Sequence, residues 1–119
     1  MSHIATVKTE VKSLHGLSAA CRRLKLASPK NGTHRLFAGQ TATGYAVKLP
    51  GWRYPVVFDL TTKQVHYDSF NGHWGDEKEL DKLKQAYAVE VAKEHARKQG
   101  FAVSEKPLAD GSIQLVCSK

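Results

Sequence analysis

The sequence predicts an α+β fold, a mainly antiparallel sheet with two helices on one face. Short segments that alternate apolar and polar residues indicate strands, and two longer segments repeat apolar residues at helical spacing. Asn-Gly and Asp-Gly pairs favour tight turns. The elements follow the order β-α-β-β-β-β-α-β-β with most strands joined as hairpins, so the helices can cover one face. The last β-α-β passage is partly ferredoxin-like.

The N-terminal region is predicted to form a strand and then a helix. Residues 4–11 alternate apolar and polar side chains, as a half-buried strand does. Ser13 is a suitable N-cap for a helix from Leu14 to about Leu26. Pro29 and the Asn-Gly pair at residues 31–32 stop this helix and predict a turn. The apolar stripe of the helix consists of Leu14, Leu17, Cys21 and Leu24.

Two further short strands are predicted before the centre of the chain. They cover residues 34–38 and 44–49, and residues 39–43 connect them as a loose hairpin. Residues 50–53 then form a turn. We expect the indole of Trp52 in this turn to be exposed.

Residues 54–75 are the stretch in which we expect any functional site to lie. Residues 56–60 and 65–68 alternate apolar and polar side chains, which predicts a hairpin across a short turn at residues 61–63. A loop with an Asn-Gly pair then leads into the longest helix. We expect the hairpin and loop to pack on that helix, with Trp74 buried.

The longest helix is predicted to run from an acidic start to Gly100. Asp76 and Glu79 have the spacing of a capping box, and Gly100 suits the position after the helix end. A helix of about 24 residues spans about 36 Å, more than a small sheet needs, so its C-terminal half is free to project or to meet a partner. A last hairpin covers residues 101–105 and 112–117.

Length and composition indicate one folded domain, residues 1–119, of which 41% are hydrophobic. The sequence has no run of 18 apolar residues and no pattern of a secretory leader, so we expect no membrane span and a cytoplasmic location. Cys21 and Cys117 fall on inward-facing positions, which predicts two buried free thiols. A disulfide and a catalytic thiol are the alternatives.

The net charge of +7 lies in the N-terminal half of the chain. Residues 1–53 carry +8, whereas residues 54–119 carry −1. A basic half suggests nucleic acid or an acidic protein face as partner. A solvated surface, with cations complementing the C-terminal end of the first helix, is the alternative. The candidate basic patch consists of Arg22, Arg23, Lys25, Lys30 and Arg35.

Several stretches together resemble one family. They read MSHIATVKTEV, YPVVFD, VHYDSFNGHWG, QAYAVEVAKEHARKQG and LADGSIQLV, and they cover nearly the whole chain. The resemblance is to small proteins of unknown function typified by the hypothetical chloroplast open reading frame thirty-five, found in algal plastids, cyanobacteria, other bacteria and some phages. It implies no established activity. Relatives often occur near genes for AAA-type ATPases and small ferredoxins, which implies a partner role.

The residue patterns favour binding over catalysis. No nucleophile elbow, phosphate-binding loop or dinucleotide fingerprint is present, so we expect no catalytic residue and no cofactor. His66, Asp68 and His73 are suitable ligand types, but their spacing matches no metal signature, so no metal is predicted. The candidate partner-binding set is rich in the residue types of interface hot spots: Trp52, Arg53, Tyr54, His66, Asp68, His73 and Trp74.

We therefore expect a non-enzymatic binding module, an adaptor or accessory subunit of a protein assembly, with an AAA-type ATPase as one implied partner. The alternative is a nucleic-acid-binding protein whose basic half contacts phosphates and whose aromatic side chains stack on bases. A contiguous positive face with exposed aromatics would favour nucleic acid, and an apolar groove would favour a protein partner. The oligomeric state is left open.

Overall fold

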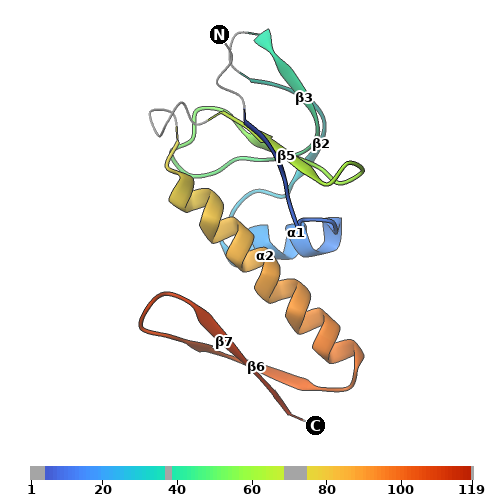
Figure 1. The fold of residues 1–119 in the computed structure, drawn as a ribbon, viewed down its shortest axis with the longest axis vertical. Coiled ribbons are helices and arrows are strands. Elements are labelled where there is room, and N and C mark those ends of the chain that lie inside the picture. Colours follow the sequence, from blue (N-terminus) through green and yellow to red (C-terminus); the bar gives the residue numbers. More distant parts are fainter. Residues whose placement is uncertain (1–4, 37–38, 69–74, 119) are drawn as a thin grey trace.

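The computed structural model describes residues 5–36, 39–68 and 75–118. One antiparallel sheet has the strand order β1-β5-β4-β3-β2, and a separate two-stranded sheet consists of β6 and β7. The helices α1 and α2 lie on the same face of the larger sheet (Figure 1). The α+β class and the predicted order of elements are confirmed. The bounds are β1 (Ala5–Lys8), α1 (Leu14–Arg23), β2 (Lys30–Arg35), β3 (Thr41–Val47), β4 (Val56–Asp59), β5 (Gln64–Tyr67), α2 (Glu77–Lys98), β6 (Ala102–Pro107) and β7 (Ile113–Ser118).

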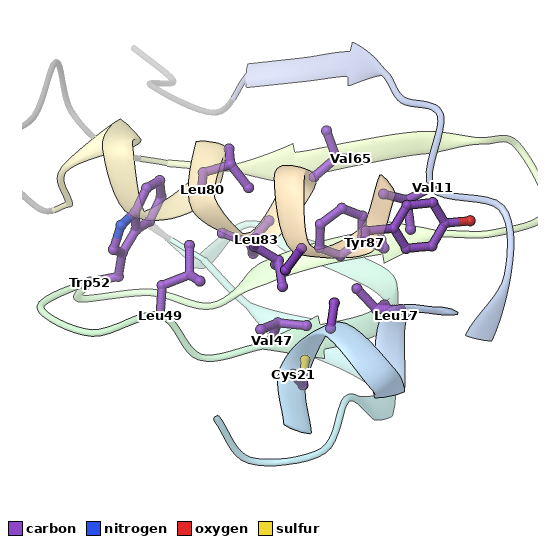
Figure 2. Packing of buried hydrophobic residues seen from close by; sticks show 14 residues of the cluster. Val11, Leu17, Cys21, Val47, Leu49, Trp52, Val65, Leu80, Leu83 and Tyr87 are labelled. Atoms are coloured by element: carbon purple, nitrogen blue, oxygen red, sulfur yellow. The ribbon is translucent and has the colours of Figure 1, made fainter. Parts of the chain in front are cut away.

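The buried core lies between the two helices and the central strands β3, β4 and β5. The strand register aligns Tyr45, Phe58 and Val65 in one row and Val47 with Val56 in the next. Alternation along each strand turns these side chains toward the helices. Figure 2 shows the helix side chains that fill the space above the strands. The buried core residues of the helices are Leu17, Ala20, Cys21, Leu80, Leu83, Ala86 and Tyr87.

The two helices cross where α1 has a glycine. A Cβ atom on Gly16 would lie 2.7 Å from a methyl group of Val91 and 2.9 Å from the ring of Tyr87. The hydroxyl oxygen of Tyr87 accepts hydrogen bonds from the backbone N–H groups of Lys12 and Ser13, at 2.9 and 3.0 Å. The missing side chain at Gly16 therefore lets the helices approach, and Tyr87 ties α2 to the chain that enters α1.

The N-terminal end of α2 is fixed by Trp52. Its indole N–H donates to the backbone carbonyl of Asp76, the N-cap residue of α2, at 3.1 Å. A Cβ atom on Gly75 would lie 2.3 Å from the indole ring, so the glycine backbone packs directly on the ring face. Tyr67 meets the indole edge to face at a centroid distance of 5.9 Å. Figure 2 shows Trp52 and Tyr87 at opposite ends of the packed part of α2.

The expectation that Trp52 is exposed is wrong, because the indole is only 5% exposed. The backbone N–H of Trp52 donates to the carbonyl of Leu49 at 3.1 Å. This tight turn folds the side chain back under the start of α2. The residue predicted to pack on the longest helix was Trp74, which lies outside the described residues.

The second strand begins earlier than predicted. The Asn31-Gly32 pair was expected to form a turn, but it lies inside β2, where Gly32 is paired with Gly44 of β3. A Cβ atom on Gly44 would lie 2.4 Å from the carbonyl oxygen of Phe58, and Gly44 has φ +152°. Gly44 thus allows a close approach to the backbone of β4, and β2 ends at Arg35 rather than at residue 38.

The first helix ends three residues earlier than predicted, because the chain turns into a left-handed conformation. Lys25 has φ 59°. Its N–H donates to the carbonyl of Arg22 at 3.1 Å, and the N–H of Leu26 donates to the carbonyl of Cys21 at 2.8 Å. This pair of bonds is the Schellman motif, whose left-handed position is usually a glycine. The lysine therefore occupies a strained position.

The C-terminal hairpin is attached through polar contacts. Arg23 of α1 and Lys93 of α2 both donate to the carboxylate of Glu105, with distances of 2.8 Å and 2.7 Å for one bond from each. These hydrogen bonds lower the pKa of Glu105 to about 2. The side-chain amide of Gln85 donates to the carbonyl of Gly111 at 3.0 Å. The structure describes residues 102–118, and none of them is buried.

The prediction of two buried free thiols is correct for Cys21 and wrong for Cys117. Both cysteines are free thiols, but Cys117 is exposed. It lies on the hairpin, which has too little covering structure to bury either face. Cys21 lies in the core, and burial raises the pKa of its thiol to about 11.

Replacing Lys25 by glycine should stabilise the protein. A non-glycine residue in the left-handed region costs about 1–2 kcal/mol, partly offset by the extra freedom glycine gives the unfolded chain. We expect Lys25→Gly to raise the free energy of unfolding by about 0.5–1 kcal/mol in urea denaturation. Lys25→Ala removes the charge but keeps the strain, and it should show no such gain. Equal values for both variants would contradict this explanation.

Replacing Tyr87 by phenylalanine should destabilise the protein. Two backbone N–H groups lose their acceptor, and an unsatisfied group costs about 1–3 kcal/mol. We expect a loss in this range by chemical denaturation. Tyr45→Phe, at a half-buried ring against the same core, is the control and should change stability by less than about 0.5 kcal/mol. A similar small change for Tyr87→Phe would show that the hydroxyl contributes little.

The ion pairs of Glu105 should make the free energy of unfolding decrease as the pH falls below 4.5. The folded-state pKa of about 2 lies below the ordinary value of 4.5. The stabilisation is therefore present above pH 4.5 and is lost as the pH falls toward 2. Over this window the unfolding free energy of wild type should fall more steeply than that of Glu105→Gln, measured by denaturation at a series of pH values. Parallel curves for the two proteins would exclude the role assigned to Glu105.

Candidate partner-binding groove

The structure separates the residues of the predicted partner-binding set. Trp52 lies in the core, whereas the guanidinium of Arg53 is exposed and lies 5.9 Å from the ring centroid of Tyr54. His73 and Trp74 lie outside the described residues. Of residues 52–54, only Arg53 is thus exposed, beside the half-buried ring of Tyr54.

His66 and Asp68 have different surroundings. His66 is half-buried and is paired in the sheet with Thr6 of β1, whose hydroxyl lies 2.9 Å from the ring Nδ1. Asp68 directly follows β5 and is completely buried, so a carboxyl side chain lies inside the protein. Within the described ranges, no group of three or more His, Cys, Asp or Glu side chains is placed to hold a metal ion.

The candidate basic patch is divided by the fold. Arg23 turns toward two carboxylates, with Glu105 in hydrogen-bond contact and Glu90 at 3.6 Å. Arg35 ends β2, which Lys30 begins, so the two are roughly 16 Å apart along the strand. The remaining members, Arg22, Lys25 and Lys30, are exposed near the end of α1.

The structure contains a groove that the sequence analysis did not assign. It has a volume of about 840 Å³ and lies between residues 8–13 and the middle of α2. Its floor consists of the side chains of Tyr87, Ala88, Val91 and Ala92. Because the two alanines are small and exposed, the helix surface is hollow at this point.

Helical spacing explains why these residues share one face. Lys84, Ala88, Val91 and His95 follow one another at intervals of three or four residues, so they lie along one side of α2. The opposite wall is the extended segment that leaves β1. It is held in place by the Tyr87 hydroxyl and by the N–H of Thr9, which donates to the carbonyl of Lys63 at 3.0 Å.

The charges along the groove are mainly positive. Lys8, Lys12 and Lys84 line it, with His95 at one end. The one carboxylate of the lining is Glu10, which is 94% exposed and lies 3.6 Å from the ammonium of Lys12. An apolar floor with ammonium groups beside it can bind a segment that carries both apolar and acidic side chains. The sequence contained one signal for this site. The small side chains of Ala88 and Ala92 leave a depression on the surface of the long helix.

No helix in the described part of the chain combines the length and the apolar composition needed to cross a membrane. A comparison with curated proteins and one with solved structures each found no match. A family model described as "Protein of unknown function (DUF1257)" matches residues 39–116. The match includes β3 to β6, the first four residues of β7 and the α2 side of the groove, but not the wall formed by residues 8–13. Because the match covers more than half of the 119 residues, the chain belongs to this family of proteins of unknown function.

Proposed function

We propose that this protein is a non-enzymatic binding module that acts as an adaptor or accessory subunit of a protein assembly. Its groove between residues 8–13 and α2 holds an acidic, amphipathic segment of a partner protein. The observation that carries the proposal is the combination of an apolar floor and lysine-bearing walls in one groove. We also propose that the chain is related to the proteins typified by the plastid open reading frame thirty-five.

The size of the groove supports a peptide segment as its occupant. A volume of about 840 Å³ is comparable to that of pockets that bury small ligands, and several apolar side chains fit into it. The floor offers Tyr87 and Val91 for apolar contact, and Ala88 and Ala92 leave room for larger side chains of the partner. An amphipathic helix or an extended segment is a usual occupant of such a groove.

The charges support an acidic occupant. Three lysines and one glutamate line the groove, so a segment with carboxylates beside its apolar residues finds complementary charges. Charge complementarity mainly raises the rate of association and excludes basic segments. The charge asymmetry of the chain agrees with this assignment, since the basic N-terminal half contributes Lys8 and Lys12.

Affinity capture with groove variants tests this proposal. Ala92→Trp fills the groove, and Lys84→Glu reverses a charge beside it. Both positions are exposed, so the fold should persist. We expect mass spectrometry to identify proteins with acidic amphipathic segments that wild type retains and that both variants lose. Nuclease treatment should leave this capture unchanged.

Two exposed positions outside the groove provide matched controls. Ala27→Trp and Lys78→Glu make the same chemical changes there and should capture the same partners as wild type. Identical captures by all four variants would refute the groove as the binding site. Loss of every partner after nuclease, with binding that falls steeply as salt rises, would instead favour the nucleic-acid alternative.

A further inference from the structure

Strand β7 has an open edge in the described part of the chain. Among the described strands, β6 is the single hydrogen-bonded neighbour of β7. The N–H of Leu108 donates to the carbonyl of Ser112 at 2.9 Å, and the register pairs Ser104 with Val116. Hydrogen-bonded and non-hydrogen-bonded pairs alternate in an antiparallel ladder. The backbone groups of Val116 therefore point to β6, and those of Ile113, Leu115 and Cys117 point outward.

The other free edges of the described strands are protected. The same alternation turns Pro107 of β6 outward, where it offers no N–H, and β6 also carries Glu105 and Lys106. The edge strand β1 has only four residues and ends in a lysine, and β2 has a basic residue at each end. These are the usual means by which proteins prevent unwanted strand pairing.

The outer strand β7 has none of these protections. Its sequence, Ile-Gln-Leu-Val-Cys-Ser, contains no charge and no proline, in a chain of which 24% is charged. The side chain of Val116 is 46% exposed, and Cys117 is exposed as well. An isolated two-stranded sheet is only marginally stable in water, and this one is joined to the helices through polar contacts.

We propose that β7 pairs antiparallel with β7 of a second copy of the chain, which joins the two hairpins into a four-stranded sheet. With the two-fold axis at Leu115, the outward-facing residues match. Leu115 pairs with Leu115 of the second copy, and Ile113 pairs with Cys117 of the second copy. Each such pair exchanges two backbone hydrogen bonds. Because both copies use the same edge in a two-fold arrangement, the interface is closed and the assembly stops at a dimer.

The lack of charge on β7 makes a second copy a suitable occupant. Two molecules of net charge +7 repel each other, and like charges placed opposite each other across strands are destabilising. The uncharged β7 brings two copies together without opposing any charged side chains of the two strands. A partner recognised by complementary charge would instead require charged residues on β7.

The shape of the molecule leaves room for the second copy. The molecule is 53 Å long, and the β6–β7 hairpin lies at the end opposite the larger part of the five-stranded sheet (Figure 1). Two copies joined at β7 therefore keep their sheets apart. The groove on α2 is formed by other residues, so dimer formation and partner binding rest on separate surfaces.

Sedimentation equilibrium tests the dimer with two variants at one position. Wild type should change from 13.2 kDa toward twice that mass as its concentration rises. Cys117→Pro removes an outward N–H and no bond to β6, so it should weaken association by about tenfold or more. Cys117→Ala keeps the N–H and should associate like wild type, which also excludes a disulfide as the cause.

Hydrogen exchange provides a second measurement that does not depend on a variant. The amides of Leu115 and Cys117 should exchange more slowly as the concentration rises, whereas the amide of Val116, bonded to β6, should not change. The Val116 amide should also stay protected in Cys117→Pro, which shows that the hairpin persists. A monomer at every concentration, or equal association of the proline and alanine variants, overturns the proposal.

The variant Ala92→Trp, which fills the groove, should leave the dimer intact. One of the two proposals can therefore be wrong while the other holds.

Discussion

The contact between Tyr87 and the chain that enters α1 is the interaction on which much of the structure depends. One hydroxyl oxygen accepts two backbone N–H groups just before the helix, and the ring of the same residue packs over Gly16. The contact fixes the distance between the helices, the direction of α1 and the path of residues 8–13. The groove exists because this segment is held beside α2 at one point and remains apart from it elsewhere.

Trp52 provides the second fixed point of α2. Its indole bonds the carbonyl of the N-cap residue and lies against Gly75, so the start of the helix cannot shift along the sheet. Between Trp52 and Tyr87 the helix contributes Leu80 and Leu83 to the core. Beyond Tyr87 the helix runs past the sheet and supports the C-terminal hairpin. A helix anchored to the core in this way carries the C-terminal hairpin on its far half, away from the sheet.

Periodicity was enough to predict the fold class, the order of elements and the ends of α2. The helix cap at Asp76 and the glycine at residue 100 act locally, so sequence neighbours determine them. The early end of α1 comes from the local turn at Lys25, but other errors concern features that depend on distant residues. Asn31-Gly32 lies in a strand because β3 pairs with it, and Trp52 is buried because Gly75, far along the chain, leaves room for its ring. The groove, likewise, requires the crossing of α1 and α2, which no local pattern contains.

The distribution of core residues also determines how the molecule opens. In the described part of the chain, the hydrophobic core and the partly buried side chains against it end at Val91. The hairpin contributes no residue to this cluster, so its detachment would break ion pairs and polar contacts and leave the cluster packed. Segments attached in this way open at a lower free energy than the whole protein. Within the described residues, the C-terminal hairpin is thus expected to open to a protease before the helices and the larger sheet do.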